Sequence, residues 1–139
     1  MVDHARLLSH ARSAAEHAYA PYSEFPVGAA ILTADGNLYT GCNVENASYG
    51  LTICAERNGA TTLVASTSPD DKAGRRIDTV AFVGLKAAPC WPCGACRQVL
   101  REFGCTTVVV EDENGVPLAL PFDELLPYSF GPEHLPEGA

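Results

Sequence analysis

The sequence feature that most restricts the fold is a group of three cysteines and one glutamate spread over two distant segments. Cys54 and Glu56 lie in Cys54-Ala55-Glu56-Arg57, whereas Cys93 and Cys96 lie much further along the chain in Pro92–Gln98. Three thiolates occupy three corners of a zinc tetrahedron and leave the fourth for water, and a carboxylate beside that corner moves the water's protons. The chain is therefore predicted to fold so that both segments meet at one point.

The spacing of these residues predicts how the segments meet. Cys93 and Cys96 are three residues apart, which places them on one side of a first helical turn. Cys54 and Glu56 are two residues apart and converge only on a point beyond a helix N-terminus. We therefore predict two helix N-termini facing one ion, since their dipoles and free amides stabilise thiolates. The carboxylate beside the metal then predicts a hydrolytic reaction.

Two neighbours of Cys54 have both a structural and a functional interpretation. Glutamates such as Glu56 are common in first helical turns, where they complement the dipole. Beside a ligand cysteine and with P-C-x-x-C downstream, the catalytic interpretation is the stronger one. Three thiolates around Zn²⁺ leave an excess negative charge, and Arg57 would offset it by hydrogen-bonding to a sulfur. The alternative for Arg57 is a solvent-facing helix position, and the sequence does not decide between the two.

A second P-C-x-x-C, at Pro89–Cys93, overlaps the first one. In that register Pro92 would lie between the ligands, where it restricts the turn and removes an amide. A helical pattern also follows directly from Cys96, so Cys93 and Cys96 are the predicted ligands and Cys90 is a nearby bystander. One alternative is a closed structural zinc site in a binding module, with Cys90 as fourth ligand.

A redox protein is a further alternative, and it is weaker than a zinc site. A redox protein that uses only the C-x-x-C motif would leave Cys54 and Glu56 without a role. Cys42 and Cys105 stand alone beside apolar or small residues, and we expect both to be buried, inert thiols.

Charge and composition exclude several classes of protein. The 139 residues are 47% apolar and carry a net charge of −8 with only nine Lys and Arg, which argues against a nucleic acid polymer as partner and favours a small neutral ligand. No stretch approaches membrane-spanning length, and the start shows no charged leader followed by an apolar run. We expect a cytoplasmic protein, whose reducing surroundings favour metal binding over disulfides.

Hydrophobic periodicity predicts alternating helices and strands. Helices are expected over about 3–19, from about 54 and from about 96, with a further helical turn over 122–126. Strands are expected over 27–33, 38–44, 80–85 and 106–110 and near Leu118, with turns at Asp35-Gly36 and Asn114-Gly115 and a solvated loop over 66–76. This order predicts a three-layer α/β/α sandwich with a central mixed sheet of about five strands, formed by residues 1–139 as a single domain.

Four segments in this order resemble the small homotetrameric zinc-dependent cytidine deaminases of the cytidine/deoxycytidylate deaminase superfamily. They are Ser23–Ala30 (SEFPVGAA), Gly41–Gly50 (GCNVENASYG), Cys54–Arg57 (CAER) and Pro92–Gln98 (PCGACRQ). The match covers nearly the whole chain. Two departures are Pro26, where other members often have another residue, and the unfamiliar Cys90-Trp91-Pro92 context.

The resemblance implies a role for each site residue. One zinc ion per subunit would be held by Cys54, Cys93 and Cys96. Glu56 would be the catalytic proton shuttle, with Arg57 beside the metal site. The nucleoside would be held by Asn43 and Glu45 at the ribose hydroxyls and by Phe25 at the base. Positions that reach a neighbouring subunit's site, or form an aromatic lid, would be Ala47, Tyr49 and Phe130.

The implied reaction is hydrolytic deamination of cytidine and 2′-deoxycytidine to uridine and 2′-deoxyuridine plus ammonia, as in pyrimidine salvage. A sugar-reading pair such as Asn43 and Glu45 would be left unpaired by a free base. The alternative within the same fold is a deaminase for another aminopyrimidine nucleoside, such as a blasticidin-type antibiotic. Asn43, Glu45 and Phe25 favour the plain nucleosides.

Overall fold

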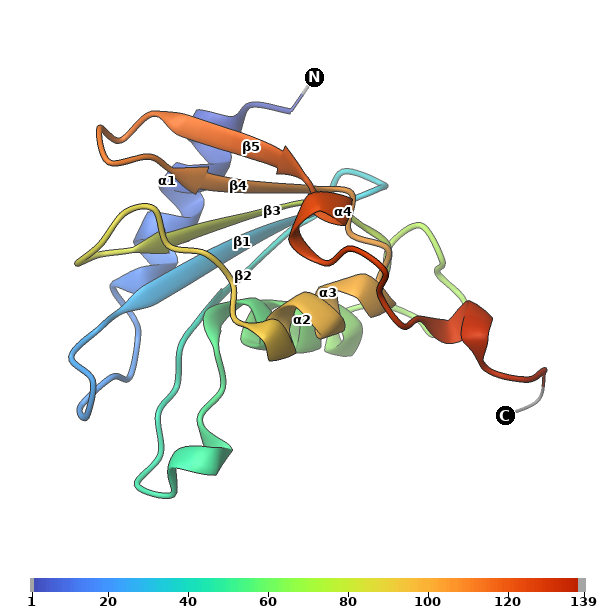
Figure 1. The fold of residues 1–139 in the computed structure, drawn as a ribbon, viewed down its shortest axis with the longest axis horizontal. Helices are drawn as coiled ribbons and strands as arrows, with labels where there is room; N and C mark the ends of the chain where they lie inside the picture. The colour runs from blue at the N-terminus through green and yellow to red at the C-terminus, as the bar shows by residue number, and fades with distance from the viewer. Residues whose placement is uncertain (1, 138–139) are drawn as a thin grey trace.

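The computed structural model describes residues 2–137 and arranges them as helices on both faces of one sheet (Figure 1). The helices are α1 (His4–Ala15), α2 (Ala55–Ala65), α3 (Gly94–Glu102) and α4 (Phe122–Leu125), with 3-10 turns η1 (Tyr49–Leu51) and η2 (Pro132–His134). The strands are β1 (Val27–Thr33), β2 (Leu38–Cys42), β3 (Ile77–Gly84), β4 (Thr107–Glu111) and β5 (Pro117–Pro121). Within residues 2–137, no helix combines the length and apolarity needed to cross a bilayer.

The sheet is mixed, as predicted, and its strands follow the order β2-β1-β3-β4-β5. β1 pairs antiparallel with both β2 and β3, β3 pairs parallel with β4, and β4 pairs antiparallel with β5. The two predicted turns are confirmed, and their glycines adopt the left-handed conformation, with φ of +90° at Gly36 and +78° at Gly115.

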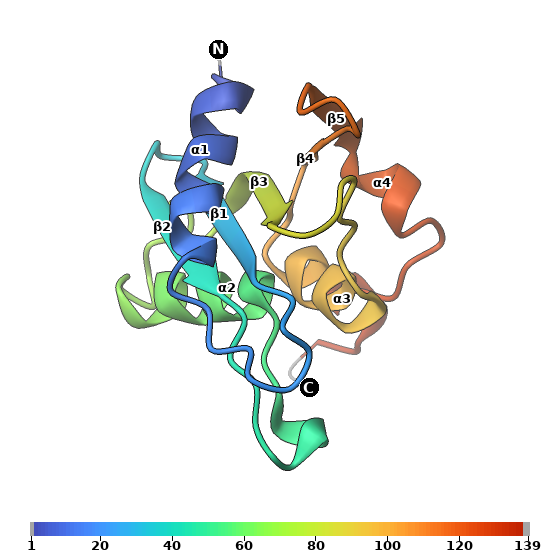
Figure 2. The same cartoon turned by 90° about the vertical axis from the view of Figure 1, so that its left-hand side faces the viewer.

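Helices cover both faces of the sheet (Figure 2), and each face buries its own apolar cluster. On one face Leu7, Leu8 and Ala11 of α1 pack against small and branched residues of β1, β3 and β4. On the other face α2, α3 and α4 cover a larger cluster that includes Ile31 and Phe82. These two clusters make the three-layer sandwich that the alternating pattern predicts.

Two elements end earlier than the sequence pattern predicts. The opening helix was predicted to reach residue 19, but it ends at Ala15 because the next amides bond three residues back and Tyr19 N donates to Asn43 O at 3.0 Å. β2 was predicted to reach Val44, but it ends at Cys42. Val44 forms isolated bridges with Tyr19 and Ile53 instead. Contacts between distant segments therefore override both local patterns.

Residues 43–53 form an arm that extends away from the sheet and the helices in both views (Figures 1 and 2). The arm carries η1 and connects β2 to α2. Its large apolar side chains are exposed, namely Val44, Tyr49, Leu51 and Ile53. An exposed group of this kind is typical of a surface that contacts another chain.

Candidate active site

The sheet topology brings the N-termini of α2 and α3 to the same edge. β2 and β3 both run antiparallel to β1, and their last residues, Cys42 and Gly84, pair with its first residues, Gly28 and Val27. α2 follows β2 and α3 follows β3, so both helices begin beyond this edge. Ligand sites in open α/β sheets lie beyond the carboxyl ends of strands in the same way.

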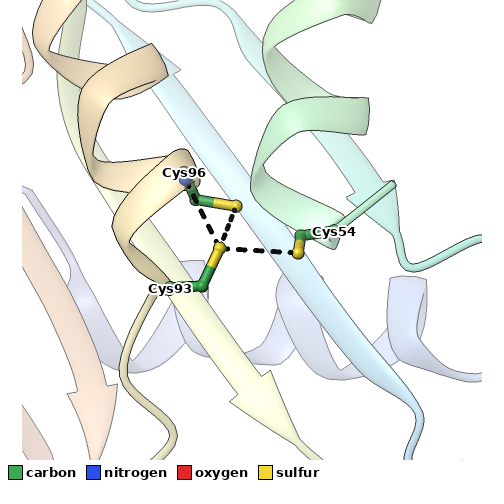
Figure 3. Close-up of side chains that lie close together, drawn as sticks. All are labelled: Cys54, Cys93 and Cys96. Carbon is green, nitrogen blue, oxygen red and sulfur yellow. Dashed lines mark hydrogen bonds between the residues drawn. The ribbon is translucent and has the colours of Figure 1, made fainter. Parts of the chain in front are cut away.

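Three cysteine sulfurs meet where the two helices begin (Figure 3). Cys54 is the residue before α2, Cys93 is the residue before α3, and Cys96 lies in the first turn of α3. The Sγ atom of Cys93 lies 3.7 Å from that of Cys54 and 3.3 Å from that of Cys96, and all three sulfurs lie within 4.8 Å of one another. A tetrahedral zinc site with Zn–S bonds of about 2.3 Å has sulfurs about 3.8 Å apart, so the trio fits zinc.

Hydrogen-bond donors face these sulfurs. The Cys96 amide donates to Cys93 Sγ at 3.4 Å, and Arg57 Nη2 donates to Cys54 Sγ at 3.6 Å and to Thr52 O at 3.3 Å. Arg57 Nε is buried and has no hydrogen-bond partner among the described residues. The guanidinium therefore lies beside the thiol group, as the functional interpretation of Arg57 predicts.

The environment of the sulfurs favours one thiolate before any metal binds. Hydrogen bonds from Cys96 and then Arg57 lower the pKa of Cys54 to about 5, although burial opposes them. The pKa of Cys96 is raised, because its proton is held in the bond to Cys54 and because the thiol is buried near Glu56. Zinc binding therefore requires further thiol protons to leave.

Glu56 lies in the first turn of α2 and is only 4% exposed. Burial raises the pKa of its carboxyl group, and hydrogen bonding from Cys96 opposes that change. A carboxyl group of this kind is able to hold and release protons closer to neutral pH than an exposed one. Its position in the wall of a cavity next to Cys54 and Cys93 agrees with the predicted role in proton transfer.

A cavity of about 260 Å³ opens beside Glu56 and two of the sulfurs. Phe25 and Asn43 line it, as the resemblance implies. Four further lining residues, all in irregular segments, were not predicted to line the site. These are Ser23, Thr52, Cys90 and Trp91.

Asn43 and Glu45 hold the chain that carries Phe25. Asn43 Nδ2 donates to Phe25 O at 2.9 Å, and Asn43 Oδ1 accepts from Val27 N at 2.9 Å. Glu45 Oε1 accepts from the amides of Tyr22 and Ser23 at 2.9 and 3.1 Å. Hydrogen bonds from Ser23 and Tyr22 also lower the pKa of Glu45, so this side chain is a carboxylate.

A second hollow of about 390 Å³ adjoins the first and shares Ser23 and Thr52 with it. Glu45 and Tyr49 line the second hollow. Together the two hollows have the size of a small-ligand site, for which about 300–1,000 Å³ is typical. Glu45 thus lies in the part of the site remote from the sulfurs.

The three residues expected near a neighbouring subunit lie on the surface. Ala47 is exposed on the arm, and Tyr49 is 75% exposed and meets Tyr22 edge-on with ring centroids 5.8 Å apart. Phe130 is 56% exposed, stacks on His134 and does not line either hollow. Within one chain, Ala47 and Phe130 are not brought to the cavity.

Among residues 2–137, the metal-ligand group consists of the three cysteines alone. Cys90 lines the cavity but does not join the sulfur group. The site as folded therefore has three protein ligands, which is the number typical of catalytic zinc sites, whereas structural sites are closed by a fourth.

Comparison with known proteins agrees with this geometry. The model of the cytidine and deoxycytidylate deaminase zinc-binding region matches residues 1–112. This chain belongs to that family. The matched region contains all three cysteines and Glu56, and the prediction of a zinc cofactor and of a hydrolytic deaminase family is confirmed.

Relatives within the deaminase family match nearly end to end. A cytidine deaminase of Sporosarcina psychrophila is 40% identical over 136 residues, covering 96% of each chain. One of Mycobacterium tuberculosis is 44% identical over 135 residues, covering 97% of this chain and 95% of the relative. The crystal structure of cytidine deaminase from Burkholderia pseudomallei matches with a TM-score of 0.80 and 44% identity, over 93% of this chain and 100% of that one. The predicted fold class is confirmed.

Proposed function

We propose that this protein is a zinc-dependent cytidine deaminase, which converts cytidine and 2′-deoxycytidine with water to the uridines and ammonia. The observation that carries the proposal is a three-sulfur group with the buried carboxyl group of Glu56 beside it in the same cavity wall. The names of the relatives support the substrate class. The reaction supplies uridine for pyrimidine salvage.

Cys54, Cys93 and Cys96 hold the metal in this proposal. Zinc bound there supplies the Lewis acidity that makes a water molecule a strong nucleophile near neutral pH. The thiolates gain stability from the N-termini of α2 and α3. Arg57 reduces the excess negative charge of the sulfur group through its bond to Cys54 Sγ.

Glu56 transfers the protons. It accepts a proton from the attacking water and passes it to ring nitrogen three while the new carbon–oxygen bond forms at ring carbon four. It then carries the second proton of the water to the amino group, the carbon–nitrogen bond breaks and ammonia leaves. Burial keeps the carboxyl group away from bulk water, so these protons are delivered to the substrate.

Asn43, Glu45 and Phe25 hold the nucleoside. Phe25 supplies an apolar surface to the base in the cavity that contains Glu56. Asn43 retains one amide hydrogen beyond its bonds to the backbone, and Glu45 retains its second oxygen, so both are available to sugar hydroxyls. A free base would leave these groups unpaired.

We further propose that the enzyme is a cytoplasmic homotetramer with sites shared between subunits, each subunit being one catalytic domain. The exposed apolar side chains of the arm support this assembly, with Ala47 and Tyr49 reaching a neighbouring site. Phe130 would close a neighbour's cavity. The free thiols of the metal site support a reducing compartment.

The test combines turnover with metal content. Purified protein loaded with zinc is mixed with cytidine, deoxycytidine or a blasticidin-type nucleoside, and loss of substrate absorbance and ammonia release are followed. We expect turnover of the first two, loss of activity with a chelator, and recovery with added zinc. Zinc-loaded tetramer that releases no ammonia from cytidine would contradict the proposal, and light scattering gives the subunit number independently.

A further inference from the structure

The dipeptide Cys90-Trp91 lines the cavity beside Glu56, although it has no part in metal binding or proton transfer. Trp91 is the only tryptophan in the chain, and 37% of its surface is exposed. Large aromatic side chains usually bury most of their surface. Trp91 is thus mostly buried, and about a third of its surface remains accessible where it lines the cavity.

Cys90 and Phe25 both lie against Gly84, the last residue of β3. A Cβ atom added to Gly84 would lie 3.1 Å from Cys90 Sγ and 3.1 Å from Phe25 Cε1, so Gly84 leaves the space in which the sulfur and the ring approach each other. Burial raises the pKa of the Cys90 thiol, which is therefore neutral. A neutral sulfur beside a ring is a soft, apolar part of the wall.

The backbone holds this dipeptide rigidly. Pro89 and Pro92 flank it and fix the backbone on both sides. Arg97 Nε donates to Pro92 O at 2.9 Å, and Arg97 Nη1 donates to Leu125 O at 2.6 Å. A surface that is already ordered loses little entropy when a ligand covers it, so the wall is suited to binding.

We propose that Trp91 and Cys90, together with Phe25, form the apolar wall that holds the pyrimidine ring. Trp91 provides the surface on which the ring stacks, and Cys90 limits the space beside Phe25. Aromatic side chains stack on the faces of bases irrespective of their hydrogen-bonding edges. The identity of the ligand as a pyrimidine nucleoside rests on the proposed function, whereas the contact itself is testable without turnover.

Fluorescence tests the contact of Trp91 directly. Because the chain has a single tryptophan, uridine added to the zinc-loaded enzyme is expected to change its emission in a saturable way. Unchanged emission at uridine concentrations that inhibit the enzyme overturns the proposal. Emission that responds in a protein without deaminase activity supports the wall and contradicts only the proposed reaction.

Alkylation tests the position of Cys90. Iodoacetamide transfers its carboxamidomethyl group to a free cysteine sulfur, with loss of iodide, and zinc protects the three ligand cysteines. Uridine is expected to slow modification of Cys90 but not of Cys42, which is half-buried outside the cavity. Cys105 serves as an unreactive reference, because only 7% of its surface is exposed. Equal modification of Cys90 with and without uridine overturns the proposal.

Kinetics of variants separate a ring contact from a structural role. Trp91→Ala is expected to raise KM about tenfold or more while kcat stays within about twofold, as for loss of a base stack. Trp91→Phe restores most of the affinity. The matched control is Leu118→Ala, because Leu118 on β5 has the same 37% exposure but lies outside the cavity lining.

Comparing cytidine with deoxycytidine distinguishes a contact of Trp91 with the base from one with the sugar. Cytidine and deoxycytidine share the same base, so loss of a ring contact raises KM for both by the same factor. If the increase in KM differs strongly between cytidine and deoxycytidine, Trp91 contacts the ribose, and its assignment to the base is overturned. Loss of kcat alone in Trp91→Ala, with KM unchanged, also overturns it.

Discussion

The helices on the two faces of the sheet begin differently. α1 begins with Asp3, whose carboxylate accepts the amide of Arg6 at 3.0 Å, a conventional cap. α2 and α3 begin with Cys54 and Cys93, a residue type outside the preferred caps. Cys54 makes no capping hydrogen bond, and Cys93 accepts one from Cys96 at 3.4 Å. The first helix uses its N-terminus for stability, whereas the other two direct theirs at the sulfurs.

The two faces also differ in what they bury. The α1 face is apolar and packs closely, with Gly28 directly under the backbone of Ala11. The α2 and α3 face buries the carboxyl group of Glu56 next to the thiols. Burial of a carboxyl group costs stability unless its charge is compensated. The difference predicts that changes on one face alter stability and changes on the other alter catalysis.

The largest expected effect is that of Glu56→Gln. The amide has the same shape but transfers no protons, so we expect kcat to fall about 10⁴-fold, at the upper end of general acid–base contributions. Zinc content and the melting temperature should stay close to those of the parent protein. Steady-state kinetics and metal analysis on the same preparation check both expectations.

Glu113→Gln is the matched control, because Glu113 is an exposed glutamate in the turn before β5. It should leave kcat unchanged. Near-normal turnover by Glu56→Gln would remove the carboxyl group from the mechanism.

The second effect is structural and belongs to the α1 face. A Cβ atom on Gly28 would lie 1.9 Å from Ala11 O, so Gly28→Ala forces α1 away from β1. We expect a loss of about 3 kcal/mol in the free energy of unfolding, at the upper end of overpacking costs. Urea denaturation of the zinc-free protein measures it.

Gly94→Ala provides the contrast, because a Cβ atom on Gly94 at the start of α3 meets nothing within 4 Å. That variant should unfold at the same urea concentration as the parent or a slightly higher one. If both variants lose the same stability, the close approach of α1 to β1 is not what makes Gly28 necessary.

The elements most accurately predicted from sequence are those determined by local patterns. The run of small and branched residues at Val27–Thr33 forms β1 with the predicted bounds, and the left-handed glycines mark the predicted turns. The prediction was wrong at the ends of α1 and β2, where Tyr19 and Val44 pair with each other. No local pattern reveals a bridge between segments so far apart.

In the candidate site, too, the residues with a local spacing were predicted, whereas those placed by contacts between distant segments were not. Cys54, Glu56, Cys93 and Cys96 were predicted because each pair has a spacing with a chemical meaning, and the structure brings the three sulfurs together. The lining by Cys90 and Trp91 was not predicted, since irregular segments have no periodicity. The hydrogen bonds of Asn43 to Phe25 and Val27 were not predicted either, because they join the residue after β2 to the segment where β1 begins.

The third prediction concerns Arg57, which hydrogen-bonds both to a sulfur of the metal site and to the backbone at Thr52. Arg57→Ala removes the donor to Cys54 Sγ and leaves Thr52 O without this partner. We expect activity to fall about 10–100-fold, as for other groups that support metal ligands. Arg57→Lys should recover part of it, because the positive charge remains.

Arg12→Ala is the control for general loss of positive charge, because Arg12 pairs with Glu111 away from the sulfurs. Its activity should match that of the parent. Zinc titration with a competing chelator then separates weaker metal binding from slower turnover at full zinc loading. A fully active Arg57→Ala at saturating zinc would show that the sulfur group needs no nearby cation.

The smallest effects test the helix N-termini directly. Asp3→Ala should reduce the free energy of unfolding by about 1 kcal/mol, the usual value of a lost cap, with kcat and KM unchanged. Cys54→Ser places a preferred cap at the start of α2 and should stabilise the zinc-free protein by a similar amount, about 0.5–1 kcal/mol. In the presence of zinc the parent is expected to be the more stable of the two. The serine variant lacks one of the three sulfur ligands, so metal binding stabilises it less. Thermal unfolding of the parent, Asp3→Ala and Cys54→Ser, each with zinc and with chelator, measures these stabilities. A Cys54→Ser variant that is less stable than the parent even without zinc would mean that Cys54 serves the start of α2 as well as the metal.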